Sequence, residues 1–335
     1  MAEKIVVLDD FIYAPVFAEC LAAEGLAVDV IVTKEIPTGT EIVALLVGPD
    51  TVGLGDPHLA ALPDLRVLSA TSAGYEHLPL RAARARGIQV TRAVNYCTEE
   101  VADHTLASIL GLLRSTASLD SAVRAGRWDI TASPPRRIAG TVLGLYGFGR
   151  IGAAVARRAR ALGIDVLVCG RSLDPRTPEL VAEGLGVVEW PELLRRADVL
   201  SLHVPLTDET RGIVDATALA AMSLGAYLVN VSRGELIDHD ALGAALRSGR
   251  LAGAAVDVLP QEPPAPDDPI LRFPNLVITP HAAFYSPDVA EKLARHVAAD
   301  VAAALNKTPS SRTGPDTTSM SSDGTVTLGR KCRSD

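Results

Sequence analysis

The chain has 335 residues, of which 48% are hydrophobic and 21% are charged, a composition that excludes disordered and fibrous proteins. Its formal net charge of −8, with no cluster of lysines and arginines, argues against a nucleic-acid partner. No apolar run approaches the ~18 residues of a membrane span, and the N-terminal segment lacks the pattern of a signal peptide, so we expect a cytoplasmic protein without a membrane partner.

The cysteines give no sign of a metal centre or a disulfide framework. None of the four belongs to a CxxC pair, the spacing typical of zinc sites and redox motifs. We therefore predict no metal site and interpret the cysteines as reduced and mostly structural. They are Cys20, Cys97, Cys169 and Cys332.

The first 95 residues alternate short apolar runs with helical patterns rich in alanine and leucine. The runs lie at 5–8, 28–32, 42–47 and 67–70. This alternation predicts a parallel sheet covered by helices. After the fourth run comes a loop of small residues, and ligands bind at this carboxyl edge of such sheets. Consecutive free N–H groups in this loop, residues 71–75, could hold a substrate carboxylate, and an ordinary turn fits the same residues equally well.

A long helical pattern begins at Thr98 and continues to Leu113. Glu99 and Glu100 lie in its first turn, where the helix dipole favours negative charge. We expect this helix to cross from the first domain to a second one.

Residues 141–172 predict a strand, a phosphate-binding loop, a helix and a second strand. The loop reads Gly147-Phe148-Gly149-Arg150-Ile151-Gly152, a spacing that allows a tight turn, backbone approach to a pyrophosphate and close helix packing. The N-terminus of the helix favours the phosphate through its unpaired N–H groups and its dipole. A bare motif of this kind also occurs in ordinary glycine loops, but the surrounding strands and helix indicate dinucleotide binding.

Arg171 and Ser172 determine which dinucleotide we expect. NAD-binding domains place a carboxylate near this position for the ribose 2′-hydroxyl, and residues 169–172 contain none. A guanidinium and a hydroxyl can instead hydrogen-bond a 2′-phosphate. We therefore predict a preference for NADP(H). If Arg171 is only a solvated loop charge, NAD(H) remains the alternative.

Six apolar runs from residue 142 onward suit a complete dinucleotide-binding domain. They lie at 142–146, 166–168, 199–204, 227–231, 254–258 and 276–279. The helical pattern at 287–305 should return to pack on the first domain. Residues 306–335 are rich in Ser, Thr, Gly, Pro and Asp, which predicts a disordered tail.

Four polar residues lie at or beyond the ends of the later runs: Arg233, Asp257, Glu262 and His281. Each alone has an ordinary structural interpretation, such as a surface charge or a cap. Together they supply what hydride transfer to a ketone requires. A two-pronged guanidinium such as Arg233 can hold the carboxylate of a 2-oxo acid and polarise its carbonyl. His281 can donate the proton, and Glu262, if bonded to the other ring nitrogen, would favour imidazolium and fix the ring.

These motifs resemble those of the D-isomer-specific 2-hydroxyacid dehydrogenase family over residues 1–305. The matching stretches are Val101-Ala102-Asp103-His104, 202–207 with Thr210, 229–238, and Pro280-His281. The resemblance implies an α/β fold with two doubly wound parallel-sheet domains, a Rossmann dinucleotide-binding domain inserted in a flavodoxin-like substrate domain. We expect the substrate-binding domain at 1–97 and 286–306, the NAD(P)-binding domain at 98–285, and the tail at 307–335.

The resemblance also implies roles for single residues. Arg233, Glu262 and His281 fall on the family's catalytic positions, and Asp257 on that of the acid that contacts the nicotinamide carboxamide. The segment Ser72 to Gly74 resembles the family's backbone clamp on the substrate carboxylate. Further expected contacts are Thr98, Val204, Pro205 and Thr210 for the cofactor and Tyr285 for the substrate.

Departures from the family pattern narrow the substrate. Phosphoglycerate members carry basic side chains around the first-domain loop, whereas residues 69–77 contain no Lys or Arg. Formate-oxidising members have an amide where Glu262 stands, so formate is disfavoured as a substrate. Residues 280–286 are similar to the corepressor branch, whose members bind dinucleotides and partner proteins. In lacking a carboxylate at 170–172, the chain resembles glyoxylate and hydroxypyruvate reductases that use NADPH.

We therefore expect a homodimeric, NADPH-dependent reductase of a small 2-oxo acid that forms the D-hydroxy acid. One alternative is an NAD-dependent dehydrogenase of a dedicated biosynthetic acid with a phosphonate or aromatic side group. Another is a dinucleotide-sensing interaction protein of the corepressor type.

Overall fold

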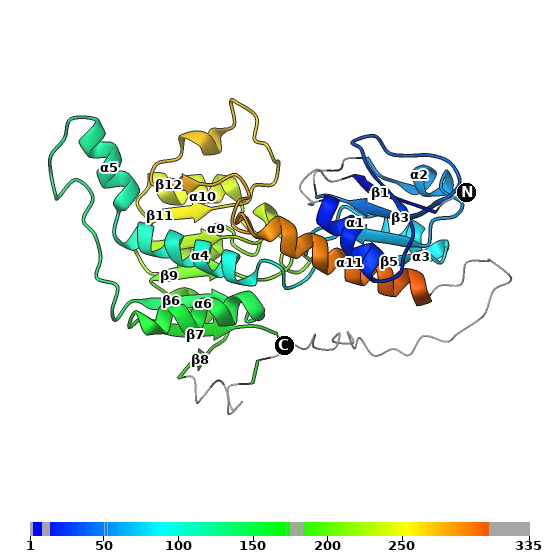
Figure 1. Ribbon diagram of the computed structural model, residues 1–335. Coiled ribbons are helices and arrows are strands. Elements are labelled where there is room, and N and C mark those ends of the chain that lie inside the picture. The colour runs from blue at the N-terminus through cyan, green and yellow to red at the C-terminus, as the bar shows by residue number, and fades with distance from the viewer. Residues whose placement is uncertain are drawn as a thin grey trace.

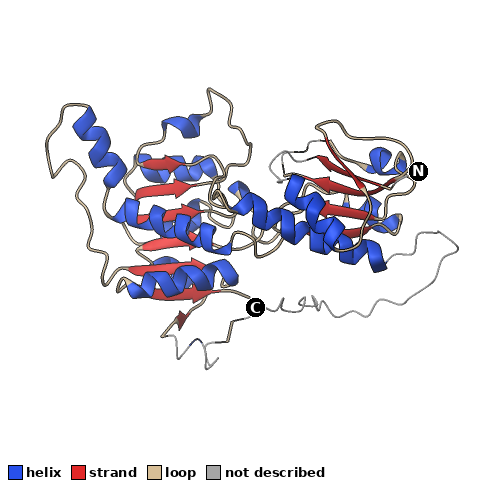
Figure 2. Ribbon diagram, viewed as in Figure 1, coloured by secondary structure: helices blue, strands red, loops and turns tan. Residues whose placement is uncertain are grey.

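The structure is a computed structural model that describes residues 3–8, 14–49, 51, 53–171, 173–174, 180 and 184–307. Two parallel β-sheets with helices on their faces form two α/β domains, as the sequence predicted (Figures 1 and 2). Ser172, Cys332 and residues 308–335, for which the sequence made predictions, lie outside the described residues. No described helix has both the length and the apolarity of a membrane-spanning segment.

The first sheet has five parallel strands in the order β2-β1-β3-β4-β5. They are β1 (Lys4–Leu8), β2 (Asp29–Val32), β3 (Ile42–Val47), β4 (Val67–Ala70) and β5 (Gln89–Arg92). This is the flavodoxin-like order. The sequence did not predict β5, because its four residues include no apolar run: the burial pattern is exposed at both ends and half-buried between. The helices of this part are α1 (Ala14–Ala23), α2 (Asp56–Ala60) and α3 (Leu80–Ala85).

The first sheet is completed by a helix from the far end of the described chain. Helix α11 (Val289–Lys307) packs on α1, β4 and β5, so the chain returns to the sheet from which it started (Figure 1). Val297 and Val301 on α11 are buried in one cluster with Phe17 on α1 and Ile5 on β1. Burial of each such side chain contributes about 1.5–3 kcal/mol, which accounts for the docking of this distant helix.

The second sheet has seven parallel strands in the order β12-β11-β10-β9-β6-β7-β8. They are β6 (Val142–Tyr146), β7 (Asp165–Cys169), β8 (Gly186–Val187), β9 (Val199–Leu202), β10 (Ala226–Asn230), β11 (Leu251–Val256) and β12 (Leu276–Ile278). The sequence predicted all but the two-residue β8. The strand order reverses between β6 and β9, and the crevice at such a reversal is where doubly wound sheets bind ligands.

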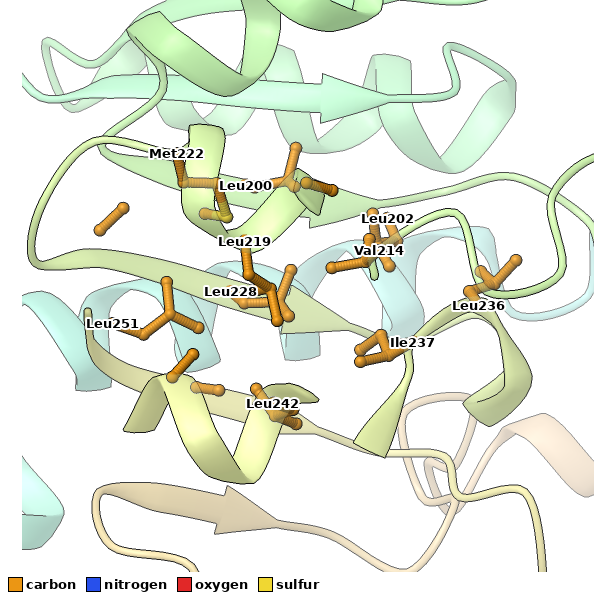
Figure 3. Packing of buried hydrophobic residues seen from close by; sticks show 14 of the residues in the cluster. Leu200, Leu202, Val214, Leu219, Met222, Leu228, Leu236, Ile237, Leu242 and Leu251 are labelled. Atoms are coloured by element: carbon orange, nitrogen blue, oxygen red, sulfur yellow. The ribbon is translucent and has the colours of Figure 1, made fainter. Parts of the chain in front are cut away.

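Helices cover both faces of the second sheet. They are α4 (Thr98–Leu113), α5 (Thr116–Arg124), α6 (Arg150–Ala161), α8 (Trp190–Arg196), α9 (Ala216–Ala221) and α10 (His239–Arg247), with short 3₁₀ turns η1 (Gly234–Leu236) and η2 (Pro269–Arg272). On one face Leu200, Leu228 and Leu251 pack beneath Leu219 of α9 and Leu242 of α10 (Figure 3). Helices α4 and α6 cover the other face. Strands buried on both faces read as continuous apolar runs, which explains why they were predictable.

The two connections between the domains meet at one carboxylate. Glu100, in the first turn of α4, accepts a hydrogen bond from the Ser286 hydroxyl at 3.2 Å and pairs with Lys292 of α11 at 3.1 Å. The segment that enters the second domain is therefore tied to the segment that leaves it.

Candidate active site

Arg233 leaves the end of β10 on a turn that buried Asn230 holds. The Asn230 side chain donates to the carbonyl of Arg233 at 2.7 Å and accepts from the N–H of Ser232 at 3.0 Å. Asn230 is fully buried, and Ser232 adds a hydrogen bond to the carbonyl of Leu202 on the neighbouring strand at 2.8 Å. The backbone of Arg233 is thus fixed relative to the centre of the sheet. Sequence analysis did not identify Asn230 as part of the site, although it directly precedes the predicted Val231-Ser232-Arg233 loop.

The guanidinium of Arg233 reaches the loop of the first domain. Its Nη1 donates to the carbonyl of Ser232 at 2.7 Å, and its Nη2 lies 3.4 Å from Oε2 of Glu76. It also lies directly against Gly74, where any side chain would collide with it. Arg233 therefore joins the two domains at the carboxyl ends of their sheets, as expected for a site between the domains.

His281 and Glu262 form the pair that the sequence predicted. His281 Nδ1 lies 2.7 Å from Glu262 Oε2, and the other carboxylate oxygen accepts from the N–H of Leu259 at 2.7 Å. Partial burial alone would raise the pKa of Glu262, but these two hydrogen bonds and the charges of His281 and Arg233 outweigh it, so the pKa lies below its usual value. The hydrogen bonds between described residues leave Nε2 of His281 without a partner, and that nitrogen can face a substrate.

Asp257 organises the loop that carries His281. Its buried carboxylate accepts hydrogen bonds from the hydroxyl of Thr279 and from the N–H groups of Ala282 and Ala283, the latter two at 2.9 and 2.8 Å. His281 itself has φ +53°, a left-handed conformation that the surrounding bonds must hold. The resemblance predicted Asp257 as a contact of the nicotinamide carboxamide, and the structure gives its carboxylate this second, structural task.

His104 extends the same network from the helix that connects the domains. Its Nε2 lies 3.2 Å from the Thr279 hydroxyl and 3.8 Å from Asp257 Oδ1. Because α4 and the His281 loop are far apart in sequence, only the motif match at 101–104 pointed to this residue, and it gave no role.

A cavity of about 150 Å³ lies between these residues. Its described lining consists of Arg233, Gly234, Glu235, Val258, Leu259, Pro260, Glu262 and His281. Gly234 is required here, because a side chain would collide with the backbone of Leu259 and Pro260. The three predicted catalytic residues thus line one small, open pocket.

The loop at residues 72–74 lies beside Arg233, which is in direct contact with Gly74. Among the described residues, none accepts a hydrogen bond from the backbone N–H of Ser72, Ala73 or Gly74. The Ser72 hydroxyl donates to the carbonyl of Gly74 at 2.6 Å and so stabilises the turn. Arg92, at the end of β5, donates to the carbonyl of Ala73 at 3.0 Å and lies 4.8 Å from the centre of the Tyr75 ring.

The glycine loop after β6 has the properties that a bound pyrophosphate requires. Gly147 has φ +102° and lies against the backbone of His203, and a side chain on Gly152 would collide with the carbonyl of Gly147. In contrast, a Cβ atom on Gly149 would meet nothing within 4 Å. The open side of the loop therefore lies at Gly149, directly before α6, where helix N–H groups favour an anion. The residues present fit a dinucleotide.

Arg171 lies beyond β7 with an exposed side chain. Burial raises the pKa of the Tyr146 phenol and the nearby Cys169 thiol adds to this, while the positive charge of Arg171 opposes it. The pKa of Glu209 is lowered mainly by the Thr207 hydroxyl, with a smaller effect of Arg171. Arg171 therefore contributes positive charge where the second strand of the motif ends.

The remaining predicted contacts lie in three places. Val204 packs against the glycine loop, and the Thr210 hydroxyl donates to the carbonyl of Pro205 at 2.8 Å, so it shapes the 205–210 loop from within. Phe148 and Ile151 pack on the sheet, whereas Arg150 is exposed. Thr98 begins α4, and the Tyr285 side chain, 58% exposed, follows the His281 loop.

Comparison with known proteins identifies relatives of the whole fold. Residues 106–283 match the family model of the D-isomer specific 2-hydroxyacid dehydrogenase, NAD binding domain. A glyoxylate reductase from Korarchaeum cryptofilum is 39% identical over 249 residues, 72% of this chain and 74% of the relative.

Two solved structures cover nearly the whole chain. D-lactate dehydrogenase from Aquifex aeolicus, in complex with NAD and lactic acid, has a TM-score of 0.80 and 27% identity over 91% of this chain and 96% of its own. An acyclic imino acid reductase in complex with NADPH and D-Arg has a TM-score of 0.78 and 25% identity over 91% of this chain and 98% of its own.

Proposed function

The chain belongs to the family of D-isomer-specific 2-hydroxyacid dehydrogenases, and from this premise we propose that it reduces a small 2-oxo acid of the glyoxylate or hydroxypyruvate type to the D-2-hydroxy acid with NADPH. The observation that carries the proposal is the shared pocket of Arg233, Glu262 and His281. An oxidoreductase of this family requires a cation for the substrate and a proton donor beside it, and this pocket contains both.

The roles follow from the hydrogen bonds. Glu262 holds Nδ1 of His281, which directs Nε2 toward the cavity as the proton donor. Arg233 binds the substrate carboxylate and stabilises negative charge that develops on the carbonyl oxygen. The N–H groups of Ser72 to Gly74 hold the carboxylate from the other domain. The nicotinamide, when bound, would supply the hydride; Asp257 would contact its carboxamide, and the glycine loop at 147–152 would hold the pyrophosphate of the cofactor.

The preference for NADPH rests on Arg171. Residues 169–172, at the end of β7, include no carboxylate at the position that NAD-binding domains use, and Arg171 supplies a positive charge there. Relatives bind either NAD or NADPH, so the preference is a property of this chain to be measured.

The test is NADPH and NADH oxidation with glyoxylate and hydroxypyruvate, for the wild type and for Arg171→Ala. We expect NADPH to be preferred and Arg171→Ala to reduce that preference by about tenfold or more, the loss of a charged hydrogen bond to phosphate. A wild type that prefers NADH would contradict the cofactor assignment. Tight cofactor binding without turnover on any 2-oxo acid would contradict the reductase and favour a dinucleotide sensor.

We propose in addition that the enzyme acts as a cytoplasmic homodimer. The support is apolar surface on the segment that follows α5: Trp128 is 90% exposed and Ile130 is 84% exposed. Helix α5 projects away from the body of the second domain, and this segment follows it (Figure 1). Large apolar side chains at such exposure are typical of surfaces that a partner covers.

A further inference from the structure

Glu76 has no role in the proposed reaction, although it contacts one of the proposed catalytic residues. It lies on the loop after β4, and its Oε2 is 3.4 Å from Nη2 of Arg233. The Glu76 side chain is 48% exposed and that of Arg233 31%, so a ligand can reach both partners. A substrate carboxylate that binds Arg233 must therefore compete with Glu76. Once displaced, the Glu76 carboxylate lies beside the bound substrate.

The charges around Arg233 match a single negative charge on the substrate. Among the described residues that line the cavity, Arg233 is the only arginine or lysine, and two carboxylates, Glu235 and Glu262, stand beside it. Glu262 is bonded to His281, and Glu235 lies 3.9 Å from Arg211. Glu76, which adds a third carboxylate, has Arg233 as its ion-pair partner.

Arg92, at the end of β5, is a cation that contacts the first-domain loop. It donates to the carbonyl of Ala73 and lies over the ring of Tyr75. Arg92 is not among the described residues that line the cavity, whereas Glu235 and Glu262 are, so a second anionic group on a substrate in the cavity would face these carboxylates.

We propose that Glu76 is a specificity-determining residue that selects 2-oxo acids with a neutral, hydrogen-donating side group over those with a second negative charge. This inference rests on the proposed function. When the substrate displaces Glu76 from Arg233, the released carboxylate accepts a hydrogen bond from a hydroxyl on the side group and repels a carboxylate or phosphate. Glyoxylate has no side group for Glu76 to contact, so it serves as the reference acid against which the other two are compared.

The experiment compares kcat/KM for glyoxylate, hydroxypyruvate and oxaloacetate in the wild type, Glu76→Gln and Glu76→Asp. Glutamine keeps the size of the side chain and removes its charge, whereas aspartate keeps the charge and serves as the matched control. We expect Glu76→Gln to raise kcat/KM for oxaloacetate relative to glyoxylate by about tenfold or more, because a like-charge contact is removed. The ratio for hydroxypyruvate should fall, and Glu76→Asp should keep the wild-type order.

The outcomes separate this inference from the proposed function. Wild-type turnover of glyoxylate is the readout of the proposed function, and its absence, with all three acids inactive, would sink both. Normal glyoxylate turnover with unchanged ratios in Glu76→Gln overturns the role of Glu76 alone. An equal fall in KM for all three acids in Glu76→Gln would also overturn it, because Glu76 would then be only a competitor for Arg233. A wild type that prefers oxaloacetate would overturn it as well.

Discussion

At the scale of single residues, each side chain proposed to react, or the loop that carries it, is held by hydrogen bonds from another residue. Glu262 is bonded to His281 and to a backbone N–H, Asn230 fixes the turn of Arg233, and Asp257 fixes the loop of His281. Such supporting bonds hold reacting groups within the narrow tolerance that proton transfer requires. The structure therefore explains why the chain keeps polar residues buried at the ends of apolar strands.

The sequence predicted three residues that the structure brings together in one pocket, but not most of the residues that support them. Arg233, Glu262 and His281 follow strands within short motifs, so their position could be predicted from the chain alone. Asn230 lies within the predicted strand at 227–231, and the contact of Glu76 with Arg233 joins residues 157 positions apart. No local sequence pattern predicts a contact between residues so far apart in the sequence, because the contact depends on how the two domains dock.

His203 leads to a prediction on the pH dependence of stability. Burial lowers its pKa from 6.5 to about 4, and its Nε2 lies 2.9 Å from the Ser201 hydroxyl. In the unfolded chain the imidazole takes up a proton near pH 6.5, whereas the folded protein keeps it neutral down to about pH 4. The stability that depends on neutral His203 is therefore complete above pH 6.5 and is lost as the pH falls toward 4.

We expect urea unfolding to detect this effect by comparison with His203→Gln, which has no titrating ring. Between pH 7.5 and 4.5 the wild type should lose about 2 kcal/mol more stability than the variant, the order of magnitude that a shift of this size implies. Equal losses in the two proteins would contradict the burial of His203. The difference between them removes the contribution of the carboxylates, which titrate in both.

At the scale of elements, the sequence predicted the long helices and every strand except the edge strands β5 and β8. The buried strands of both sheets and α4 have unbroken apolar patterns. Strand β5 contains no apolar run and β8 has only two residues, so neither has a sequence pattern that predicts a strand. Their positions are set by pairing with β4 and β7, which is a property of the folded sheet.

The glycine loop gives a matched pair of predictions at this scale. A Cβ atom at Gly149 meets open space in this structure but stands where a pyrophosphate would approach, whereas one at Gly152 collides with the carbonyl of Gly147. Gly149→Ala should therefore fold normally and bind NADPH about tenfold or more weakly, since backbone approach is hindered. Gly152→Ala should instead lower the stability of the free protein by about 1–3 kcal/mol.

Thermal unfolding without cofactor and a titration of cofactor fluorescence measure the two effects. If both variants lost stability equally and bound NADPH as tightly as the wild type, the phosphate-binding assignment of this loop would be wrong.

At the scale of the whole molecule, the contacts between the two domains include the Glu100 connection and Arg233 at the first-domain loop, while α11 brings the chain back to the first sheet. The fold class could be predicted from the alternation of strands and helices. The docking of the domains could not, because it depends on single long-range contacts.

The proposed homodimer is tested at this scale. Replacement of Trp128 by aspartate places a charge on the exposed apolar segment and should shift the protein from dimer to monomer in light scattering, without loss of helix content. The ring centre of Trp190 lies 4.5 Å from that of Tyr146 within the second domain. Trp190 is not part of the exposed segment, so Trp190→Phe is the control. A wild type that is monomeric at all concentrations would contradict the proposal.

The measurement that tests the account most directly is glyoxylate-dependent NADPH oxidation by the wild type and by His281→Asn, with NADPH binding measured in parallel. Asparagine cannot donate a proton as imidazolium does, so we expect kcat to fall by about 10²-fold or more while cofactor binding is retained. Equal turnover by the two proteins would contradict the role of His281 and, with it, the assignment of the Arg233, Glu262 and His281 pocket as the active site.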